Sequence, residues 1–222
     1  MKIEEIFPGV FKIDRKLATK NLTPRYTVYG EKTVQVEGEE YRFWDPYRSK
    51  LGAAIMHGLK ELPIHNEDSI LYLGAANGTT PSHVSDIVGN EGIVYCVEFA
   101  PRSMRDLIPV CEKKHNMIPI LADARKPLDY KEYIEGKADC VYEDVAQPDQ
   151  IRILTLNSKE YLKKRGPALI AVKSQSISAT RHKGEIFKEA MEEADLDFEI
   201  LESMQLEPFE KDHLFLSLKF RS

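Results

Sequence analysis

The sequence predicts an α/β protein. Its main sheet is doubly wound and mostly parallel, with seven strands of which one is antiparallel, and a small antiparallel β-unit precedes it. From Ser49 onward, short apolar runs alternate with amphipathic helical patterns, as in folds where helices cross over between parallel strands. The last two apolar runs, 198–206 and 214–220, have no helix between them, so they should pair antiparallel. The first 48 residues instead show the alternation and turn signals of short strands.

The β-unit is expected over residues 1–48, and the main domain over residues 49–222. Within the β-unit, β-branched and aromatic residues gather in short runs, and Gly30 and Gly38 mark the turns between the later ones. The predicted strands are 10–13, 26–29 and 33–36.

The main domain contains seven apolar runs of strand length, separated by helical patterns and turn signals. The predicted strands are 69–73, 92–97, 117–121, 138–142, 168–172, 198–206 and 214–220. Helices should follow Ser49 and Thr80, two residues suited to N-caps, the second with Pro81 in the first helical position. The other predicted helices begin at Pro101, begin at Pro148, and surround 186–194.

Composition bounds the class of protein. No apolar run approaches the roughly 20 residues of a membrane span, and the N-terminus lacks a signal-peptide layout. We therefore expect no membrane contact and a cytoplasmic location. Cys96, Cys111 and Cys140 occur singly, so buried reduced thiols are expected, with neither disulfides nor a metal site. Charged residues far outnumber Asn and Gln, a weak indication of a thermophile.

The net charge of the chain argues against unaided binding to nucleic acid. The formal charge is −5, whereas a protein that binds nucleic acid unaided usually has a strong basic surplus. If the substrate is RNA, a local basic surface or a partner protein must supply the affinity.

A glycine-rich loop follows the first strand of the main domain. Ligands of an open α/β sheet bind beyond the carboxyl ends of its strands, and Gly74, Ala75 and Gly78 occupy that place. Small residues let the backbone approach a ligand, and the helix that follows offers free N–H groups. Ala76 replaces the second glycine of G-x-G-x-x-G, so the loop alone also fits a tight turn without a ligand.

Acidic residues after the next three strands favour a nucleoside. Glu98 comes 20 residues beyond Gly78, where a carboxylate can accept both ribose hydroxyls, and Asp123 and Asp144 follow the third and fourth strands. A nicotinamide-dependent dehydrogenase would share the loop and Glu98. It would not explain Asp123 or the antiparallel finish, both of which are typical of methyltransferases.

Two lysines could act on an acceptor at the same edge. Lys50 begins the helix before the first strand, and Lys173 ends the fifth strand. Most lysines are simply solvated, but two of them near Asp144 could remove a proton from a ribose hydroxyl, because mutual repulsion lowers lysine pKa values. His213 could complete this network or could be an ordinary turn histidine.

Five blocks of sequence resemble the fibrillarin family, the RNA 2′-O-methyltransferases of box C/D ribonucleoproteins, and in particular its archaeal form. The resemblance covers essentially the whole chain, although the Gly/Arg-rich tail of eukaryotic members is absent, so nucleolar residence is not implied. The blocks are 42–51 (RFWDPYRSKL), 72–86 (YLGAANGTTPSHVSD), 98–103 (EFAPRS), 144–148 (DVAQP) and 207–213 (EPFEKDH).

The resemblance implies a cofactor, a reaction and partners. The cofactor is S-adenosylmethionine, and the reaction is guide-RNA-directed 2′-O-methylation of rRNA and tRNA. The partners are a Nop-type scaffold protein, a box C/D guide RNA and, indirectly, a kink-turn-binding protein of the same particle. The family's catalytic positions correspond to Lys50, Asp144, Lys173 and His213. The predicted cofactor contacts are Gly74, Ala75, Gly78, Thr79, Thr80, Glu98, Phe99, Asp123, Ala124, Asp144 and Gln147.

Other interpretations stay open. We expect Lys173 to accept the proton or stabilise the oxyanion, with Lys50 and Asp144 as its electrostatic setting and His213 as an orienting group.

A small-molecule methyltransferase or a non-catalytic assembly subunit of the particle remains an alternative. Trp44, with Tyr41, Phe43 and Tyr47 near it, could stack on bases, but we favour core packing between the β-unit and the main domain.

Overall fold

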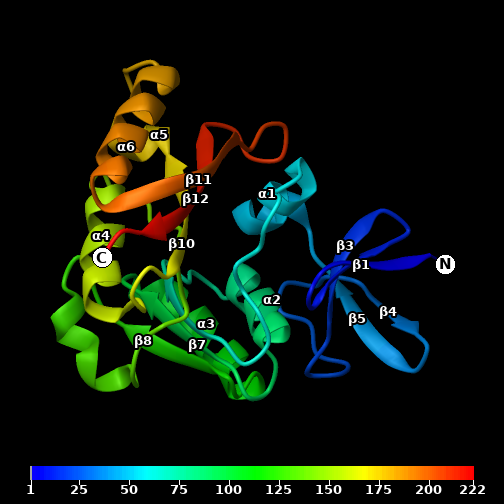
Figure 1. Cartoon of the computed structure of the whole chain (residues 1–222). Helices are drawn as coiled ribbons and strands as arrows, with labels where there is room; N and C mark the ends of the chain where they lie inside the picture. The colour runs from blue at the N-terminus through cyan, green and yellow to red at the C-terminus, as the bar shows by residue number, and fades with distance from the viewer. Residues whose placement is uncertain (1) are drawn as a thin grey trace.

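The computed structural model describes residues 2–222 and contains one mixed seven-stranded sheet in the main part of the chain (Figure 1). The strand order is β11-β12-β10-β9-β6-β7-β8. Only β12 runs in the direction opposite to the other strands, so the predicted doubly wound sheet with one antiparallel strand is confirmed. The strands are β6 Ser69–Leu73, β7 Ile93–Glu98, β8 Met117–Leu121, β9 Cys140–Glu143, β10 Pro167–Lys173, β11 Phe198–Gln205 and β12 His213–Phe220.

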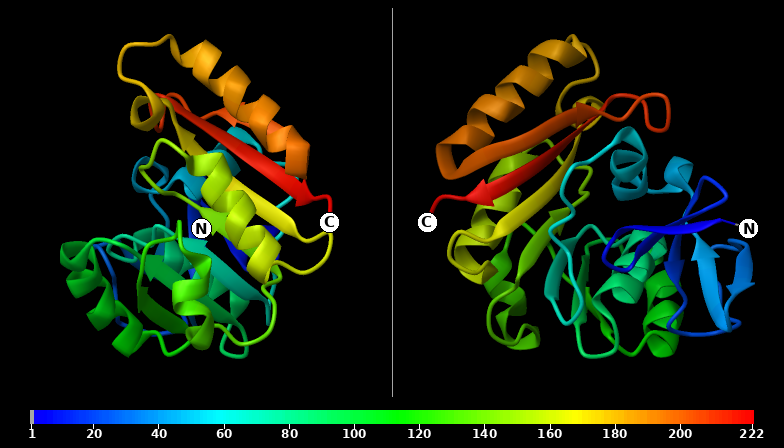
Figure 2. Two further views of the ribbon diagram at one scale, coloured as in Figure 1. Left: turned by 90° about the vertical axis from the view of Figure 1, so that its left-hand side faces the viewer. Right: turned by 45° about the vertical axis from the view of Figure 1, so that its right-hand side comes forward.

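Helices cover both faces of this sheet (Figure 2). Successive residues of β6 are buried on opposite faces, which is why the strand reads as continuous apolar sequence. Ile70 and Tyr72 pack with α1, α2 and α3, whereas Leu71 and Leu73 pack with η2, α4 and α6. The helices are α1 Lys50–His57, α2 Thr79–Val88, α3 Pro101–Lys113, α4 Gln150–Tyr161, α5 Ser174–Ile177 and α6 Lys183–Asp197, with 3₁₀ turns η1 Pro46–Arg48 and η2 Pro127–Tyr133.

Helix starts follow the sequence signals in part. Ser49 caps α1 as predicted, since its Oγ accepts a hydrogen bond from the Gly52 N–H at 3.1 Å. The predicted cap at Thr80 is wrong, because α2 already begins at Thr79 with Gly78 as its N-cap. The Thr80 hydroxyl instead donates to the Ser49 hydroxyl at 2.9 Å and so ties α2 to α1.

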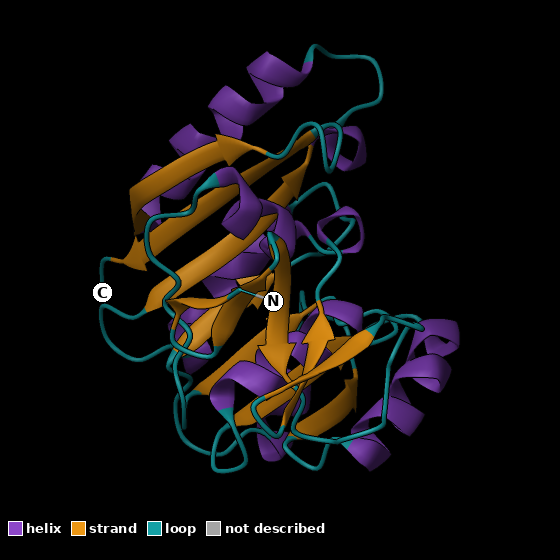
Figure 3. Ribbon diagram, turned by 90° about the vertical axis from the view of Figure 1, so that its right-hand side faces the viewer, coloured by secondary structure: helices purple, strands orange, loops and turns teal. Residues whose placement is uncertain are grey.

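The N-terminal β-unit is a separate five-stranded antiparallel sheet, which lies in front of the main sheet in Figure 3. Its strand order is β1-β2-β3-β5-β4. The strand predicted at 26–29 is wrong, because the backbone N–H groups of Val28 and Tyr29 donate to the Glu31 carboxylate rather than to a neighbouring strand. The strands are β1 Ile3–Phe7, β2 Val10–Ile13, β3 Lys16–Lys20, β4 Thr33–Val36 and β5 Glu39–Phe43.

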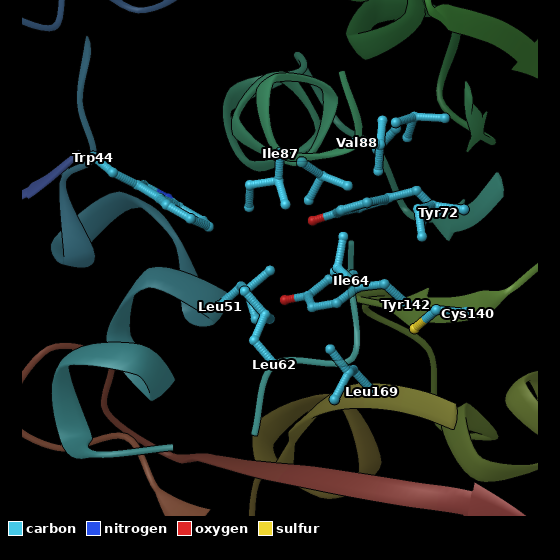
Figure 4. Close-up of a cluster of buried hydrophobic side chains, with 14 of the residues drawn as sticks. Trp44, Leu51, Leu62, Ile64, Tyr72, Ile87, Val88, Cys140, Tyr142 and Leu169 are labelled. Atoms are coloured by element: carbon cyan, nitrogen blue, oxygen red, sulfur yellow. The ribbon is translucent and has the colours of Figure 1, made fainter. Parts of the chain in front are cut away.

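Trp44 joins the β-unit to the main domain. Its side chain is 1% exposed and stacks on His83 of α2 with ring centroids 4.7 Å apart, at the margin of the core that contains Tyr72 and Tyr142 (Figure 4). Core packing is therefore confirmed for Trp44. It is wrong for Tyr47, which is 61% exposed.

A buried polar network forms the second link between the two parts. Arg42 of β5 is fully buried, and its guanidinium pairs with Asp86 of α2 at 2.8 Å and also with Glu31. Buried Lys114 pairs with the other oxygen of Asp86. The Thr19 hydroxyl also donates to Asp86, at 2.9 Å. Every charge in this network has a partner, as buried charges require.

The three cysteines are buried free thiols, as predicted. Across residues 2–222, none of the helices has the length and apolar character needed to cross a membrane.

Candidate active site

The predicted site residues come to one edge of the main sheet. Parallel strands β6 to β10 end at this edge, and a ligand of an open α/β sheet binds there. Gly74 directly follows β6, Glu98 ends β7, Asp123 comes two residues after β8, Asp144 follows β9, and Lys173 ends β10.

Gly74 and Asp144 are in direct backbone contact. Gly74 has φ +81°, and a Cβ at this position would lie 2.4 Å from the Asp144 carbonyl oxygen. The Asp144 N–H in turn donates to the Leu73 carbonyl at 2.9 Å. Only glycine combines this left-handed conformation with so close an approach. The glycine loop and the acid after β9 therefore form one unit.

Gly78 leaves the start of α2 open. It is the N-cap, and no side chain of residues 2–222 caps the first turn of the helix. Free N–H groups at a helix N-terminus attract an anionic group such as a carboxylate. The loop and this helix end therefore suit the amino-acid part of S-adenosylmethionine.

Lys50 and Asp144 form an ion pair beside the loop. Lys50 Nζ lies 2.9 Å from Asp144 Oδ2, and the two side chains are 25% and 19% exposed. Both line a hollow of about 340 Å³, which we call the catalytic hollow. Its other lining residues are Tyr47, Arg48, Tyr72, Gly74, Ala75, Ala76, Asn77, Thr79, Thr80 and Pro81.

Glu98 braces the loop from the next strand. Its Oε2 accepts the Ala76 N–H at 2.8 Å, and its Oε1 accepts the Ala100 N–H at 2.7 Å. Each carboxylate oxygen can accept a further hydrogen bond, so ribose hydroxyls remain possible partners. The following residue, Phe99, is 60% exposed and offers an apolar ring at the same edge.

Asp123 is not a free carboxylate. The Arg125 guanidinium donates to both of its oxygens, with Nε–O distances of 3.1 and 3.2 Å, and this pairing lowers the pKa of Asp123. The next residue, Ala124, is buried, and Gln147 is half-buried. Five of the predicted cofactor contacts lie outside the lining of the catalytic hollow: Glu98, Phe99, Asp123, Ala124 and Gln147.

Lys173 and His213 are paired residues of β10 and β12. The side-chain amide of Gln150 holds the Lys173 backbone on both sides, accepting its N–H at 2.9 Å and donating to its carbonyl at 3.2 Å. Lys173 forms no ion pair with any acid of residues 2–222. Neither Lys173 nor His213 lines the catalytic hollow.

The His213 ring has a fixed orientation. Its Nδ1 lies 2.7 Å from the Lys211 carbonyl, which can only accept, so the neutral ring carries its proton on Nδ1 and leaves Nε2 as an acceptor. Burial lowers the pKa of His213, and the Lys50 charge lowers it further. Asp144 opposes this effect, so Lys50, Asp144 and His213 act on one another electrostatically.

Sequence reasoning missed Glu143. This last residue of β9 is fully buried, and neither carboxylate oxygen has a hydrogen-bond partner among residues 2–222. Burial raises its pKa well above the usual range, and Asp144 adds to the rise. Burial therefore disfavours the ionised form of this carboxyl. An acid placed directly after the apolar run 140–142 was the available signal. Gln150, also missed, had no comparable signal.

No group of three or more His, Cys, Asp or Glu side chains in residues 2–222 is arranged to hold a metal ion. The groups gathered at this edge are the glycine loop, the acids Glu98, Asp123 and Asp144, the lysines Lys50 and Lys173, and His213.

The chain is similar to known proteins over its full length. The fibrillarin family model matches residues 1–222. A fibrillarin-like rRNA/tRNA 2′-O-methyltransferase of Pyrococcus furiosus is 53% identical over 212 residues, 93% of each chain. The corresponding protein of Methanocaldococcus jannaschii is 49% identical over 220 residues, 96% of this chain and 95% of the relative.

Three solved structures are similar in both sequence and fold. A Methanococcus jannaschii fibrillarin pre-rRNA processing protein superposes with a TM-score of 0.95 at 47% identity, covering 100% of this chain and 98% of the other. Aeropyrum pernix fibrillarin, in complex with natively bound S-adenosyl-L-methionine, gives 0.90 at 43%, covering 98% of each. The fibrillarin of a fibrillarin/Nop5p complex gives 0.89 at 40%, covering 98% and 100%.

Proposed function

This chain belongs to the fibrillarin family, and we propose that it transfers a methyl group from S-adenosylmethionine to ribose 2′-hydroxyls of rRNA and tRNA. The observation that carries this function is the Lys50–Asp144 ion pair in the wall of the catalytic hollow, in contact with the glycine loop. It places a charged pair suited to handling an acceptor hydroxyl next to a loop suited to a nucleoside cofactor.

The residues at the sheet edge fit S-adenosylmethionine chemically. When bound, this cofactor supplies an electrophilic methyl group on a sulfonium. The glycine loop would hold its amino-acid part, Glu98 its ribose hydroxyls, and the segment from Asp123 to Ala124 its base, with Phe99 and Gln147 beside it. Support comes from the open start of α2 and from the spare acceptor capacity of Glu98.

The chain's own groups would position the acceptor and handle its proton. In this proposal Lys173 accepts the proton of the 2′-hydroxyl or stabilises the oxyanion. Asp144 fixes Lys50 in its ion pair, and His213 orients the acceptor through its free Nε2. Orientation should supply most of the acceleration, up to roughly 7–11 kcal/mol in favourable cases, and base catalysis about 10²–10⁴-fold.

We propose that the enzyme works inside a particle. A fibrillarin similar to this chain forms a complex with Nop5p, which supports a Nop-type scaffold as the direct partner. A box C/D guide RNA and a kink-turn-binding protein are the further proposed members. The net charge of −5 agrees with an enzyme that is delivered to RNA by partners rather than one that searches for it. A cytoplasmic location and a division into 1–48 and 49–222 stay predictions.

The test is transfer of a radiolabelled methyl group to a target RNA, with and without scaffold and guide. We expect label on one ribose of the guide-paired segment, and only in the complete particle. Label on free metabolites without any label on guided RNA would replace this function by small-molecule methylation. Assembly of the particle without any transfer would leave only a structural subunit.

A further inference from the structure

The catalytic hollow contains one cation that no acid compensates. Its lining includes two cations, Arg48 and Lys50, and one acid, Asp144. Lys50 is already paired with Asp144, at 2.9 Å. Arg48 is exposed and forms no ion pair with any acid of residues 2–222. The uncompensated positive charge of the hollow therefore belongs to Arg48.

The Arg48 guanidinium is held in place without using up its hydrogen-bond donors. It lies 5.0 Å from the centroid of the Tyr29 ring, and one of its N–H groups donates to the Tyr29 carbonyl at 3.4 Å. The Tyr29 hydroxyl is fixed in turn, 2.8 Å from His83 Nε2 of α2 and 3.2 Å from the Phe43 carbonyl oxygen. Four of the five guanidinium N–H groups remain for a ligand.

The backbone below the guanidinium is fixed as well. Arg48 ends η1, and its N–H donates to the Asp45 carbonyl at 3.1 Å. The Asp45 carboxylate accepts the Tyr47 N–H at 2.9 Å. Ser49 then caps α1, and Lys50 is the first residue of that helix. The free cation and the paired one are therefore presented to the hollow from one rigid turn.

We propose that Arg48 binds the phosphate on the 3′ side of the acceptor nucleotide, in the duplex of target and guide RNA. This phosphate and the 2′-hydroxyl are attached to adjacent carbons of one ribose, so binding the first places the second at the Lys50–Asp144 pair. The nucleotide can stay paired, because RNA duplexes are recognised mainly through 2′-hydroxyls and phosphates along the minor groove. The planar fork of arginine suits a phosphate, to which it can donate two parallel hydrogen bonds. The inference rests on the proposed function and assigns the residue that positions its acceptor.

The methyl donor also carries an anionic group, its carboxylate. The open start of α2, at Gly78, offers free N–H groups to that carboxylate. Arg48 is thus left for a second anion, and the phosphate next to the reacting hydroxyl is the one that the acceptor must bring into the hollow.

The test removes this one phosphate from a target that is otherwise paired. The target is supplied to the complete particle as two oligonucleotides that both pair with the guide. The first ends at the acceptor nucleotide, with either a 3′-hydroxyl or a 3′-phosphate. The wild type should bind the 3′-phosphate form about 10–100-fold more tightly, the usual effect of hydrogen bonds to a charged group. At subsaturating concentrations its single-turnover methylation should be faster by a similar factor.

Three variants locate the effect. Arg48→Ala should bind and methylate the two forms equally, and Arg48→Lys should keep part of the preference, because lysine retains the charge but not the fork. Arg165→Ala is the control and should match the wild type. This exposed arginine precedes β10, at the opposite edge of the sheet from Lys173, and has no ion pair with any acid of residues 2–222. All three should bind S-adenosylmethionine with the wild-type Kd.

The possible results are distinguishable. Equal preference for the 3′-phosphate in the wild type and in Arg48→Ala would overturn the proposal. If Arg48→Ala instead bound S-adenosylmethionine at least tenfold more weakly and kept the phosphate preference, the guanidinium would belong to the donor's carboxylate. A wild-type particle that binds the 3′-phosphate form more tightly through Arg48, but methylates no target, would refute the proposed function and leave Arg48 as a phosphate site.

Discussion

The carbonyl oxygen of Asp144 occupies the space where a side chain on Gly74 would begin, with only 2.4 Å between that oxygen and an ideal Cβ. The backbone that positions the Lys50 partner therefore touches the loop proposed to hold the methyl donor. A displacement of either one must move the other, so donor binding and acceptor chemistry depend on the same contact.

Gly74→Ala tests how much the contact with Asp144 contributes to stability, beyond the cost of placing alanine at a positive φ. Gly38 has a similar φ of +88° but nothing within 4 Å of its ideal Cβ, so Gly38→Ala is the matched control. The control should lose about 1–2 kcal/mol of the free energy of unfolding. Gly74→Ala should lose about 1–3 kcal/mol more, because the added methyl overpacks the site. It should also bind S-adenosylmethionine at least tenfold more weakly. Urea unfolding measures the free energy of unfolding, and calorimetry measures the Kd for S-adenosylmethionine. If the two variants gave the same values of both, the contact between Gly74 and Asp144 would not be important.

Lys173→Ala should lower the single-turnover rate of methyl transfer by about 10²–10⁴-fold, the usual contribution of a positioned proton acceptor. The Kd for S-adenosylmethionine should not change. Lys188→Ala on the exposed side of α6 is the control and should be as active as the wild type. Full activity of Lys173→Ala would remove this residue from the mechanism.

Arg42→Ala should destabilise the junction between the β-unit and α2. It leaves Glu31 without its cation and Asp86 with Lys114 alone, and breaking a buried pair typically costs about 3–5 kcal/mol. Lys20→Ala breaks the exposed pair with Glu39 and should cost less than about 1 kcal/mol. Chemical denaturation compares the two, and similar losses would show that the buried network contributes little.

Glu143→Gln should stabilise the protein above pH 7. The pKa of Glu143 is raised in the folded state, so the wild type loses stability as pH rises above the unfolded pKa of about 4.3. The uncharged amide avoids this loss, and its advantage should shrink towards zero as the pH falls to about 4.3. The free energy of unfolding of both proteins, followed from pH 4.5 to 8.5, measures the difference. Glu199→Gln on exposed β11 is the control. A pH-independent difference would contradict a raised pKa of Glu143 in the folded protein.

The main sheet could be predicted from sequence because its central strands are buried on both faces and therefore read as short apolar runs, which turn signals separate. The loop at Gly74 and the acids at Glu98 and Asp144 were found by the same logic, since strand ends meet at one edge of a parallel sheet.

The β-unit was harder to predict. Residues 26–29 have strand-like composition, but β-propensity depends on a neighbouring strand, and Glu31 takes their N–H groups instead. Strands β1, β3 and β5 were missed because their short, charged segments acquire a pattern only once they are paired.

Parts of the site depend on contacts between distant residues. Residue spacing alone could not predict the hydrogen bonds between the Gln150 side chain and the Lys173 backbone, or the pairing of Asp123 with Arg125. The same is true of the hollow lined by residues 15–17, 29–32, 43–48 and Met56, which four separate segments of chain form.

Because β12 lies between β10 and β11 although it is the last strand of the chain, the parts of the site are completed in a fixed order during synthesis. The glycine loop, Glu98 at the end of β7, and the acids after β8 and β9 are all synthesised before residue 150. His213 reaches the sheet edge only when the final strand slides into its place beside Lys173. A growing chain therefore contains every proposed contact for the methyl donor before it contains Lys173 and His213, the residues proposed to act on the acceptor.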